Sequence, residues 1–228
     1  MKILAIIPAR GGSKAIPRKN IIDFGGKPVL AWSVEQALAS TRINRVVVST
    51  DDDEIADVAR RYRAEVIVRP PELSGDTASS ESALVHVLDT LATQENYVPD
   101  LVVFLQATSP LRGEGDLDKA IAQLECEQAD TLVSAGPFHG FVWEILDGKA
   151  RPLTYDPLNR PRRQDIKAEY VVENGSFFVF KPEILRTLNS RLGGKISIYR
   201  QDLIDSFEIN ETEDMPLLLA MLRLKGQG

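Results

Sequence analysis

The sequence has 228 residues, 43% of them hydrophobic, which suits one large domain, with or without a small appendage, and is too short for two full-sized domains. Such a composition argues against a disordered chain. With 27 Lys and Arg against 33 Asp and Glu, the net charge is −6, which argues against a protein that coats nucleic acid or an anionic membrane. The charge is uneven, because residues 1–30 hold six cations and one acid, a net of +5, which leaves −11 for the rest. We therefore expect one local anion site near the N-terminus, and neither nucleic acid nor membrane as a partner.

Cysteine content and hydropathy bear on the compartment. The single cysteine, Cys126, excludes an intramolecular disulfide and a CxxC-type zinc or redox site, and it fits a reducing compartment. No apolar stretch approaches the roughly 20 residues that a membrane-spanning helix needs, and the apolar run at 3–8 is too short for a signal peptide. These features predict a cytoplasmic protein.

Short apolar runs alternate with segments of helical periodicity up to about residue 135. The predicted strands are 3–7, 45–49, 64–68, 101–105 and 131–135. The predicted helices between them are 29–40, 53–62, 79–92 and 114–127. Strands that are apolar throughout are typical of a sheet covered on both faces, so the pattern predicts a doubly wound α/β fold with a mostly parallel sheet. Ligands of such sheets bind at the carboxyl ends of the strands.

The alternation breaks after about residue 136. Residues 136–170 are rich in Pro, Gly, Arg and aromatic side chains, with a weak strand signal near 142–146. They predict a lobe or arm inserted into a single domain that spans 1–228. A regular pattern resumes with a strand at 175–180, a helix from about Pro182, a strand at 195–199 and a closing helix near 213–225.

The segment after the first strand is the most informative one. Residues 8–20 read PARGGSKAIPRKN, with two glycines, a serine and four cations. The backbone amides of Gly11, Gly12 and Ser13 can line a phosphate, and the cations supply compensating charge. The segment matches neither the GxGxxG fingerprint nor the Walker loop. Its place after the first strand favours a polyphosphate site over the alternative, a solvated basic loop.

Further motifs follow along the chain. They are STD at 49–51, RP at 69–70, DTASS at 76–80, LQATSPLR at 105–112, NG at 174–175 and FEIN at 207–210. With PARGGSKAIPRKN they resemble, over nearly the whole length, the CMP-sialic acid synthetase family, the N-acylneuraminate cytidylyltransferases and their relatives for other nine-carbon 2-keto acids. The resemblance implies a Rossmann-like nucleotidyltransferase fold. It also implies transfer of CMP from CTP to the anomeric hydroxyl of a 2-keto sugar acid, with release of pyrophosphate.

Two alternatives stay open beside this reading. One is a synthetase for the eight-carbon 3-deoxy-manno-octulosonate, although its N-terminal loop departs from the form seen here. The other is a noncatalytic nucleotide-binding protein of the same fold.

The resemblance implies roles for individual residues around the nucleotide. Arg10 and Lys19 would hold the phosphates during catalysis, and Asn20 would face the ribose or a phosphate. Arg69 and Ser80 match residues that help to recognise the cytosine. Without the resemblance, Arg69 would be read as an exposed cation after a strand and Ser80 as a helix N-cap.

The resemblance places other residues on the sugar acid. Gln106 matches the glutamine that contacts the sugar acid in this family. Arg163, with Arg162 as the next choice, resembles the arginine that holds the substrate carboxylate, whose two oxygens suit the guanidinium fork.

A metal site is implied near the C-terminus. Similar enzymes bind Mg²⁺ through an Asp-Ile-Asp pattern, and this sequence has Glu208-Ile209-Asn210. Alternate residues of an extended segment point to the same side, so Glu208 and Asn210 can still ligate one ion. The pair carries one negative charge instead of two, which predicts weaker metal binding.

The inserted arm at 136–170 is the part of the sequence that predicts how the chain assembles. Similar enzymes use this region to form a homodimer in which the arm reaches towards the partner's site. The aromatic side chains Phe138, Phe141, Trp143 and Tyr155 are hard to bury in so small a lobe. We expect a homodimer, and packing of these rings within one chain is the alternative.

Overall fold

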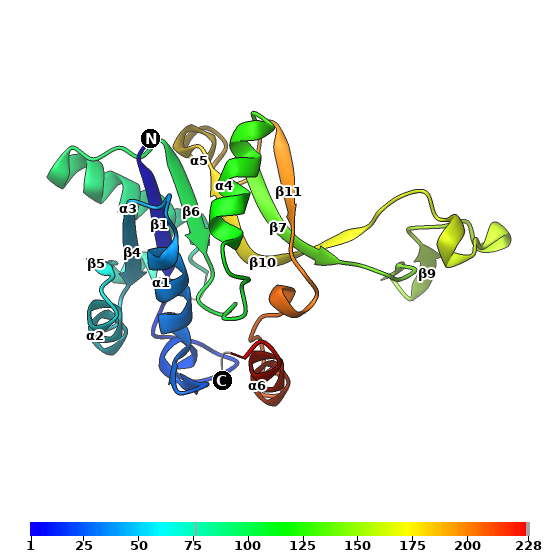
Figure 1. Cartoon of the computed structure of the whole chain (residues 1–228), viewed down its shortest axis with the longest axis horizontal. Helices are drawn as coiled ribbons and strands as arrows, with labels where there is room; N and C mark the ends of the chain where they lie inside the picture. The colour runs from blue at the N-terminus through cyan, green and yellow to red at the C-terminus, as the bar shows by residue number, and fades with distance from the viewer. Residues whose placement is uncertain (76, 227–228) are drawn as a thin grey trace.

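The computed structural model describes residues 1–75 and 77–226, and within these ranges seven strands form one sheet in the order β11-β7-β10-β6-β1-β4-β5. These strands are β1 (Ile3–Pro8), β4 (Arg45–Thr50), β5 (Glu65–Val68), β6 (Leu101–Leu105), β7 (Thr131–Pro137), β10 (Val171–Phe180) and β11 (Ile196–Arg200). Neighbouring strands are parallel except at β10, which runs antiparallel to β6 and β7. The predicted, mostly parallel sheet is confirmed (Figure 1).

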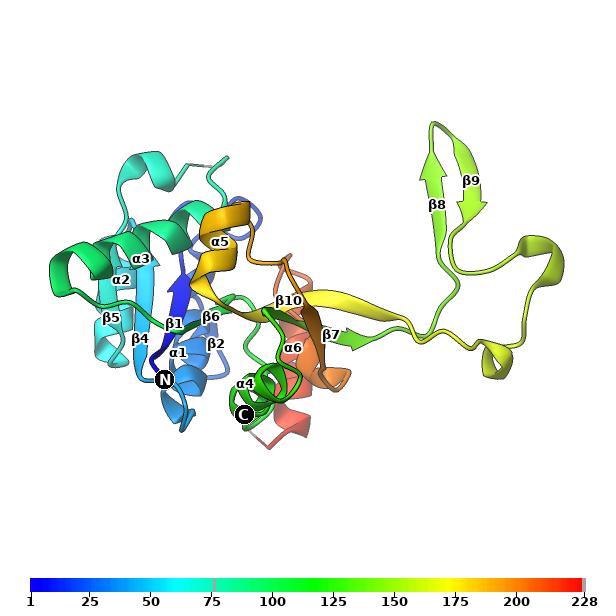
Figure 2. The same cartoon turned by 90° about the horizontal axis from the view of Figure 1, so that it is seen from above.

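Helices cover both faces of this sheet. In the described residues they are α1 (Val29–Ala39), α2 (Asp53–Arg61), α3 (Ser80–Glu95), α4 (Asp116–Cys126), α5 (Pro182–Leu188) and α6 (Asp214–Leu224). The side chains of α1, α2 and α4 pack on one face, and those of α3 and α5 pack on the other, as Figure 2 shows for α1, α4, α3 and α5. This is the doubly wound arrangement predicted from the alternating pattern.

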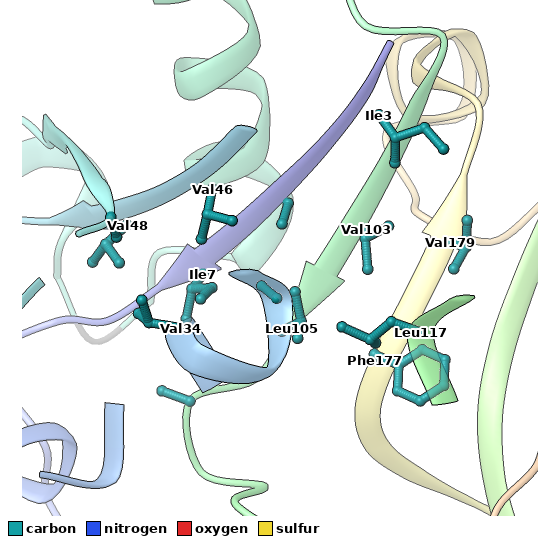
Figure 3. Close-up of a cluster of buried hydrophobic side chains, with 14 of the residues drawn as sticks. Ile3, Ile7, Val34, Val46, Val48, Val103, Leu105, Leu117, Phe177 and Val179 are labelled. Atoms are coloured by element: carbon teal, nitrogen blue, oxygen red, sulfur yellow. The ribbon is translucent and has the colours of Figure 1, made fainter. Parts of the chain in front are cut away.

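Burial from both faces explains the apolar runs. Each of residues 3–7 in β1 is at most 2% exposed. The odd-numbered side chains face α1 and α2, and the even-numbered ones face α3. Figure 3 shows the first of these clusters, where Ile7 lies with Val34 of α1 and Leu105 of β6. Both faces of β1 are therefore apolar, as in other strands that helices cover on both sides.

Strand β10 begins at Val171, four residues before the predicted start at residue 175. Its first residues pair with the end of β7, and the register then shifts between Glu173 and Phe178. Gly175, at φ +65°, lies in this irregularity, in the left-handed region where glycine is favoured. The segment Glu173-Asn174-Gly175 interrupts the apolar pattern after Val172 and hides the start of the strand from hydropathy analysis. The bulge lies at the end of the sheet that carries the site.

The chain between β7 and β10 extends away from the sheet (Figures 1 and 2). It carries a hairpin of β8 (Trp143–Leu146) and β9 (Lys149–Pro152). The ring of Tyr155 packs against Phe141 and Trp143, with centroids 4.6 and 5.9 Å apart. Part of the aromatic content is therefore paired within the arm, while Trp143 remains 47% exposed.

Across the described ranges, no helix has both the length and the apolar character to cross a bilayer.

Helix α6 lies at the same end of the sheet as the loop that follows β1 (Figure 1). Leu222 of α6 packs with Phe24, which belongs to a small hairpin of β2 (Asp23–Phe24) and β3 (Lys27–Pro28). Ile209 is fully buried in the same cluster. Burial of Ile209 fixes the short segment that carries its neighbours Glu208 and Asn210.

Candidate functional site

A polar cleft opens at the carboxyl ends of β1 and β6, where a doubly wound sheet is expected to bind ligands. The cleft has a volume of about 320 Å³. Its lining residues are Pro8, Arg10, Ser13, Lys19, Asn20, Arg69, Ala78, Ser79, Ser80 and Thr108. The structure thus brings together six residues that the sequence analysis assigned to a nucleotide. Asp76, part of the motif at 76–80, lies outside the described residues.

A hollow of about 410 Å³ lies beside α3, around His86, and two still larger ones lie elsewhere on the described residues. One, of about 650 Å³, borders Met1 and Pro99 beyond the amino ends of the strands. The other, of about 430 Å³, lies between α1 and the start of α4. Its charged lining consists of Glu35, Glu114, Asp116, Asp118, Lys27 and Arg112. Because acids outnumber cations there, we expect an anionic ligand to bind in the polar cleft at the end of β1 instead.

The loop after β1 is braced by the two aspartates that follow β4. The Gly11 amide donates to Asp51 Oδ1 at 3.1 Å. A side chain on Gly11 would meet Asp52, because its Cβ would lie 2.6 Å from Oδ2. Arg18, in the left-handed conformation at φ 58°, forms a bidentate pair with Asp52, and this pairing lowers the pKa of the Asp52 carboxyl. Asp52 also caps α2 through the Ile55 amide, so the loop is anchored to a helix start.

The three backbone amides predicted to bind phosphate, those of Gly11, Gly12 and Ser13, differ in what surrounds them. The Ser13 amide donates to the Gly11 carbonyl at 3.1 Å, and the Gly11 amide is taken by Asp51. Among the described residues, nothing lies within 4 Å of the position that a Cβ on Gly12 would occupy. An anion can therefore approach the loop most openly at Gly12, whereas at Gly11 it would have to replace the Asp51 carboxylate.

Lys19 and Asn20 connect the loop to its surroundings. Asn20 is 9% exposed, and its side chain donates to the Arg10 carbonyl at 3.0 Å. Lys19 Nζ donates to the carbonyls of Ile209 and Asn210, at 3.1 and 2.7 Å. The predicted phosphate loop and the predicted metal segment are therefore in direct contact, although they are separated by about 190 residues in sequence.

Arg69 and Ser80 form the opposite wall. Arg69 is only 6% exposed and donates to the Ser49 carbonyl at 3.0 Å, so its reading as an exposed cation is wrong. Burial lowers the pKa of Arg69, and the Asp51 charge opposes that shift. The N-cap of α3 is Ser79, whose side chain accepts from the Ser82 amide, so the reading of Ser80 as the cap is wrong by one residue. The Ser80 side chain therefore has no capping role and lines the cleft.

Glu208, Asn210 and Gln106 meet beside the bulge of β10. The Asn210 side-chain amide donates to Glu208 Oε1 at 3.1 Å, so the two side chains lie on the same side of their segment. A Cβ on Gly175 would lie 2.5 Å from Gln106 Nε2 and 3.5 Å from Glu208 Oε2. Glycine at this position therefore leaves room for the Gln106 amide next to a carboxylate.

The oxygen atoms of Glu208 and Asn210 are hard ligands of the kind that Mg²⁺ prefers. Across the described residues, no group of three or more His, Cys, Asp and Glu side chains is placed to hold a metal ion. Mg²⁺ commonly takes one or two carboxylates from the protein and completes its shell with water and substrate phosphates. The donor set here fits that shared mode of binding and does not fit a metal cage built from protein alone.

Arg112 is a buried arginine beside the site that the sequence analysis did not single out. It is 1% exposed, and its guanidinium donates to the carbonyls of Gln106, Ser109 and Ser176 at 2.5–2.7 Å. Burial lowers the pKa of Arg112 to about 9, against the opposing effects of Asp116 and Glu208, which leaves it charged at neutral pH. Nothing in its sequence neighbourhood, beyond the motif at 105–112, signals this burial.

The side chain of Asn174 stabilises the bulge of β10 through hydrogen bonds to neighbouring segments. Its side-chain oxygen accepts from Ser134 Oγ at 2.8 Å and from the Ser176 amide at 3.2 Å. Its nitrogen donates to Gln201 Oε1 at 2.8 Å. This side chain therefore takes the place of ladder bonds that the register shift interrupts.

The two arginines assigned to the substrate carboxylate lie on the arm. Arg162 pairs with Asp165 at 2.7 Å, and its side chain is 75% exposed. Arg163 borders a hollow of about 250 Å³ with Phe138 and Phe141. The arm extends away from the sheet (Figure 2), so one chain does not bring these arginines to its own Gln106.

Comparisons with known proteins agree with this layout. A cytidylyltransferase family model matches residues 4–216. The pseudaminic acid cytidylyltransferase of Campylobacter jejuni subsp. jejuni serotype O:23/36 (strain 81-176) is 47% identical over 198 residues, covering 80% of this chain and 84% of that protein. N-acylneuraminate cytidylyltransferase A of Danio rerio is 36% identical over 221 residues, covering 94% of this chain and 49% of that protein. The chain thus spans about half the length of the Danio rerio relative.

A solved structure is similar over the whole chain. It is that of CMP:2-keto-3-deoxy-manno-octonic acid synthetase complexed with CTP, with a TM-score of 0.73, 18% identity, and 99% of this chain and 100% of that chain covered. At this identity the likeness shows the fold alone. The family model, in contrast, includes both the basic loop and the segment of Glu208 and Asn210, and on this match the chain belongs to the cytidylyltransferase family.

Proposed function

We propose that the protein transfers CMP from CTP to the anomeric hydroxyl of a nine-carbon 2-keto sugar acid and releases pyrophosphate. The observation that carries the proposal is the cleft at the carboxyl end of β1, where Arg10, Lys19 and Arg69 converge. Lys19 connects this cleft to the segment of Glu208, which lies beside Gln106. The relatives named for pseudaminic and N-acylneuraminic acids support a nine-carbon substrate.

The reaction is an in-line displacement at phosphorus. The anomeric oxygen would attack the α-phosphorus of CTP and lose its proton, while the bond from that phosphorus to the β-phosphate oxygen breaks and pyrophosphate leaves. Cations placed on the phosphate oxygens favour the transition state, where negative charge spreads. Lys19 uses two donors on carbonyl groups, and an ammonium has three, so one donor remains for a phosphate beside Arg10.

Mg²⁺ belongs to this proposal. Glu208 and Asn210 would hold the ion on the side of the cleft that Lys19 joins to the basic loop. A bound Mg²⁺ would neutralise phosphate charge and orient the oxygens. The single carboxylate of the pair makes the affinity depend on the nucleotide, because the phosphates must supply further ligands.

A homodimer completes the proposal. Arg162 and Arg163 lie on an arm that extends away from the sheet (Figure 2), so they would meet a sugar acid only in the site of a second copy. The hairpin exposes apolar side chains that a partner could cover, among them Ile145 at 75% and Leu146 at 62% exposed. We also place the enzyme in the cytoplasm, where the lone Cys126 would stay reduced.

The nine-carbon reading has better support than its alternatives. The solved synthetase for an eight-carbon acid shares the fold at 18% identity, whereas the two relatives named for nine-carbon acids are 36% and 47% identical. A noncatalytic protein would have no need for Glu208 and Asn210 to lie side by side next to Lys19.

A turnover assay tests the function directly. Purified protein with CTP, Mg²⁺ and, in separate reactions, N-acetylneuraminic, legionaminic, pseudaminic or 3-deoxy-manno-octulosonic acid is expected to release pyrophosphate with at least one nine-carbon acid. Pyrophosphate is followed by a coupled phosphate assay. Release with the eight-carbon acid alone would overturn the nine-carbon reading, and CTP binding without release for any acid would identify a noncatalytic protein.

Substitutions in the basic loop test the phosphate site. Arg10→Ala and Lys19→Ala are each expected to lower kcat about 100-fold, because each removes a donor that stabilises transition-state charge. Arg60→Ala, which removes an exposed cation on α2, is the matched control and should keep wild-type kinetics. Thermal unfolding checks that all three variants fold. Near-normal kcat in both loop variants would rule out this phosphate site.

A charge change tests the metal segment. Asn210→Asp adds a second carboxylate beside Glu208, so the Mg²⁺ concentration for half-maximal activity is expected to fall about threefold or more. Glu213→Gln, which alters an exposed neighbouring carboxylate, serves as the control and should leave the Mg²⁺ dependence unchanged. The Mg²⁺ titration of initial rates gives the answer, and an Asn210→Asp variant with an unaltered titration would count against metal binding at this pair.

A further inference from the structure

An ion pair with little solvent access joins the start of α3 to the segment after α5. Arg191 Nη1 donates to Glu81 Oε1 at 2.5 Å, and the two side chains are 23% and 17% exposed. A second pair, Arg186 with Asp89, also joins α5 to α3, but its side chains are 46% and 55% exposed. Solvent and salt screen the more buried pair less, so it constrains the helix more firmly.

The Arg191 guanidinium also lies over two aromatic rings. Phe104 of β6 and Phe178 of β10 stack with centroids 5.5 Å apart and planes 13° apart. The guanidinium carbon is 4.2 Å from the Phe178 centroid and 5.4 Å from that of Phe104, and Nε is buried. Cation–π contact and the Glu81 carboxylate therefore hold the guanidinium from two sides. The start of α3 is tied in this way to the strands β6 and β10.

The residues next to Glu81 form one wall of the cleft. Ser79 caps α3 and Ser80 is its first residue, and both line the cleft. The strand β6 leads directly to Gln106, and β10 carries the bulge at Gly175. The ion pair thus connects the wall of the nucleotide cleft to the strands that carry the opposite, sugar-acid side.

We propose that Glu81 and Arg191 are positioning residues that hold the Ser79–Ser80 wall at a fixed distance from β6 and β10, and so set the affinity for CTP. The proposal rests on the proposed function, because it takes the cleft to be the CTP site. Neither side chain belongs to the lining of the described cleft, so both act through the placement of Ser80. Loosening the wall weakens nucleotide binding and leaves the reacting groups in place.

Glu81→Gln and Arg191→Met each break the pair. Each variant is expected to raise the KM for CTP about three- to tenfold, which lies within the coupling found between residues in contact. The kcat and the KM for the sugar acid should stay within about twofold of wild type. The double variant should be no worse than the worse single one, because the two residues act as one unit. Arg191→Lys keeps the charge without the planar fork and should recover part of the CTP affinity.

The pair Asp89–Arg186 supplies the matched control. Asp89→Asn and Arg186→Met remove a neighbouring ion pair, between α3 and α5 itself, far from Ser80 along α3, and should leave the KM for CTP unchanged. Thermal unfolding identifies variants that fail to fold. Should Arg191→Met be one of them, the near-isosteric Glu81→Gln carries the test.

Three results would overturn the proposal. The first is an unchanged KM for CTP in folded Glu81→Gln, and the second is an equal rise of this KM in the control variants. The third is a rise in the KM for the sugar acid that is confined to Arg191→Met, because it would indicate direct contact between Arg191 and that substrate. Calorimetric titration with CTP gives the same comparison without turnover. A wild-type protein that binds CTP but transfers nothing would refute the proposed function and still leave the positioning role measurable.

Discussion

The buried guanidinium of Arg112 is the contact on which the layout of the site depends. It lies where β6 ends and β10 bulges, and it donates to carbonyls of both segments as well as to Ser33 and Gln36 of α1. Removing this charge from water is unfavourable, and the acceptors around its two Nη atoms offset that cost, although the buried Nε has no partner among the described residues. A neutral side chain would leave several buried acceptors short of donors, at about 1–3 kcal/mol for each unpaired group.

Two lysines extend this constraint to the rest of the site. Lys225, at the end of α6, donates to the Leu111 carbonyl at 2.6 Å and pairs with Asp205, so the last helix is attached to the same turn. Lys19 fastens the basic loop to the segment that α6 supports. The phosphate loop, the Glu208 segment and the bulge at Gly175 are therefore parts of one connected structure, although they come from the two ends and the last third of the sequence. An in-line transfer needs this kind of fixed geometry between nucleotide and acceptor.

Sequence patterns predict the features that rest on local rules. Strands covered on both faces must be apolar throughout, so β1 and β6 stand out, and a glycine-rich basic loop after the first strand indicates an anion site. Features that rest on tertiary contacts escape these rules. Arg69 looks like a surface cation, and only the fold shows its burial behind the Ser49 carbonyl. The start of β10 is a further case, because the segment Glu173-Asn174-Gly175 interrupts the apolar pattern between Val172 and the buried end of the strand.

The reach of the arm could not be derived from the sequence either. Its aromatic content indicates packing without saying whether the rings meet each other or a partner, and the structure pairs Tyr155 with Phe141 and Trp143 inside the arm. The brace of Asp51 and Asp52 on the basic loop is a similar case. Asp51 belongs to the motif at 49–51 and Asp52 follows it, but their contacts with Gly11 and Arg18 depend on β4 lying beside β1.

The proposed reaction requires that the cleft at the carboxyl end of β1 binds the nucleotide. A crystal structure of the protein with CTP and Mg²⁺ tests it most directly. The triphosphate is expected between Arg10 and Lys19, with the cytosine towards Arg69 and Ser80 and the metal near Glu208. CTP bound instead in the hollow between α1 and α4, or contacting none of the basic loop, would contradict it.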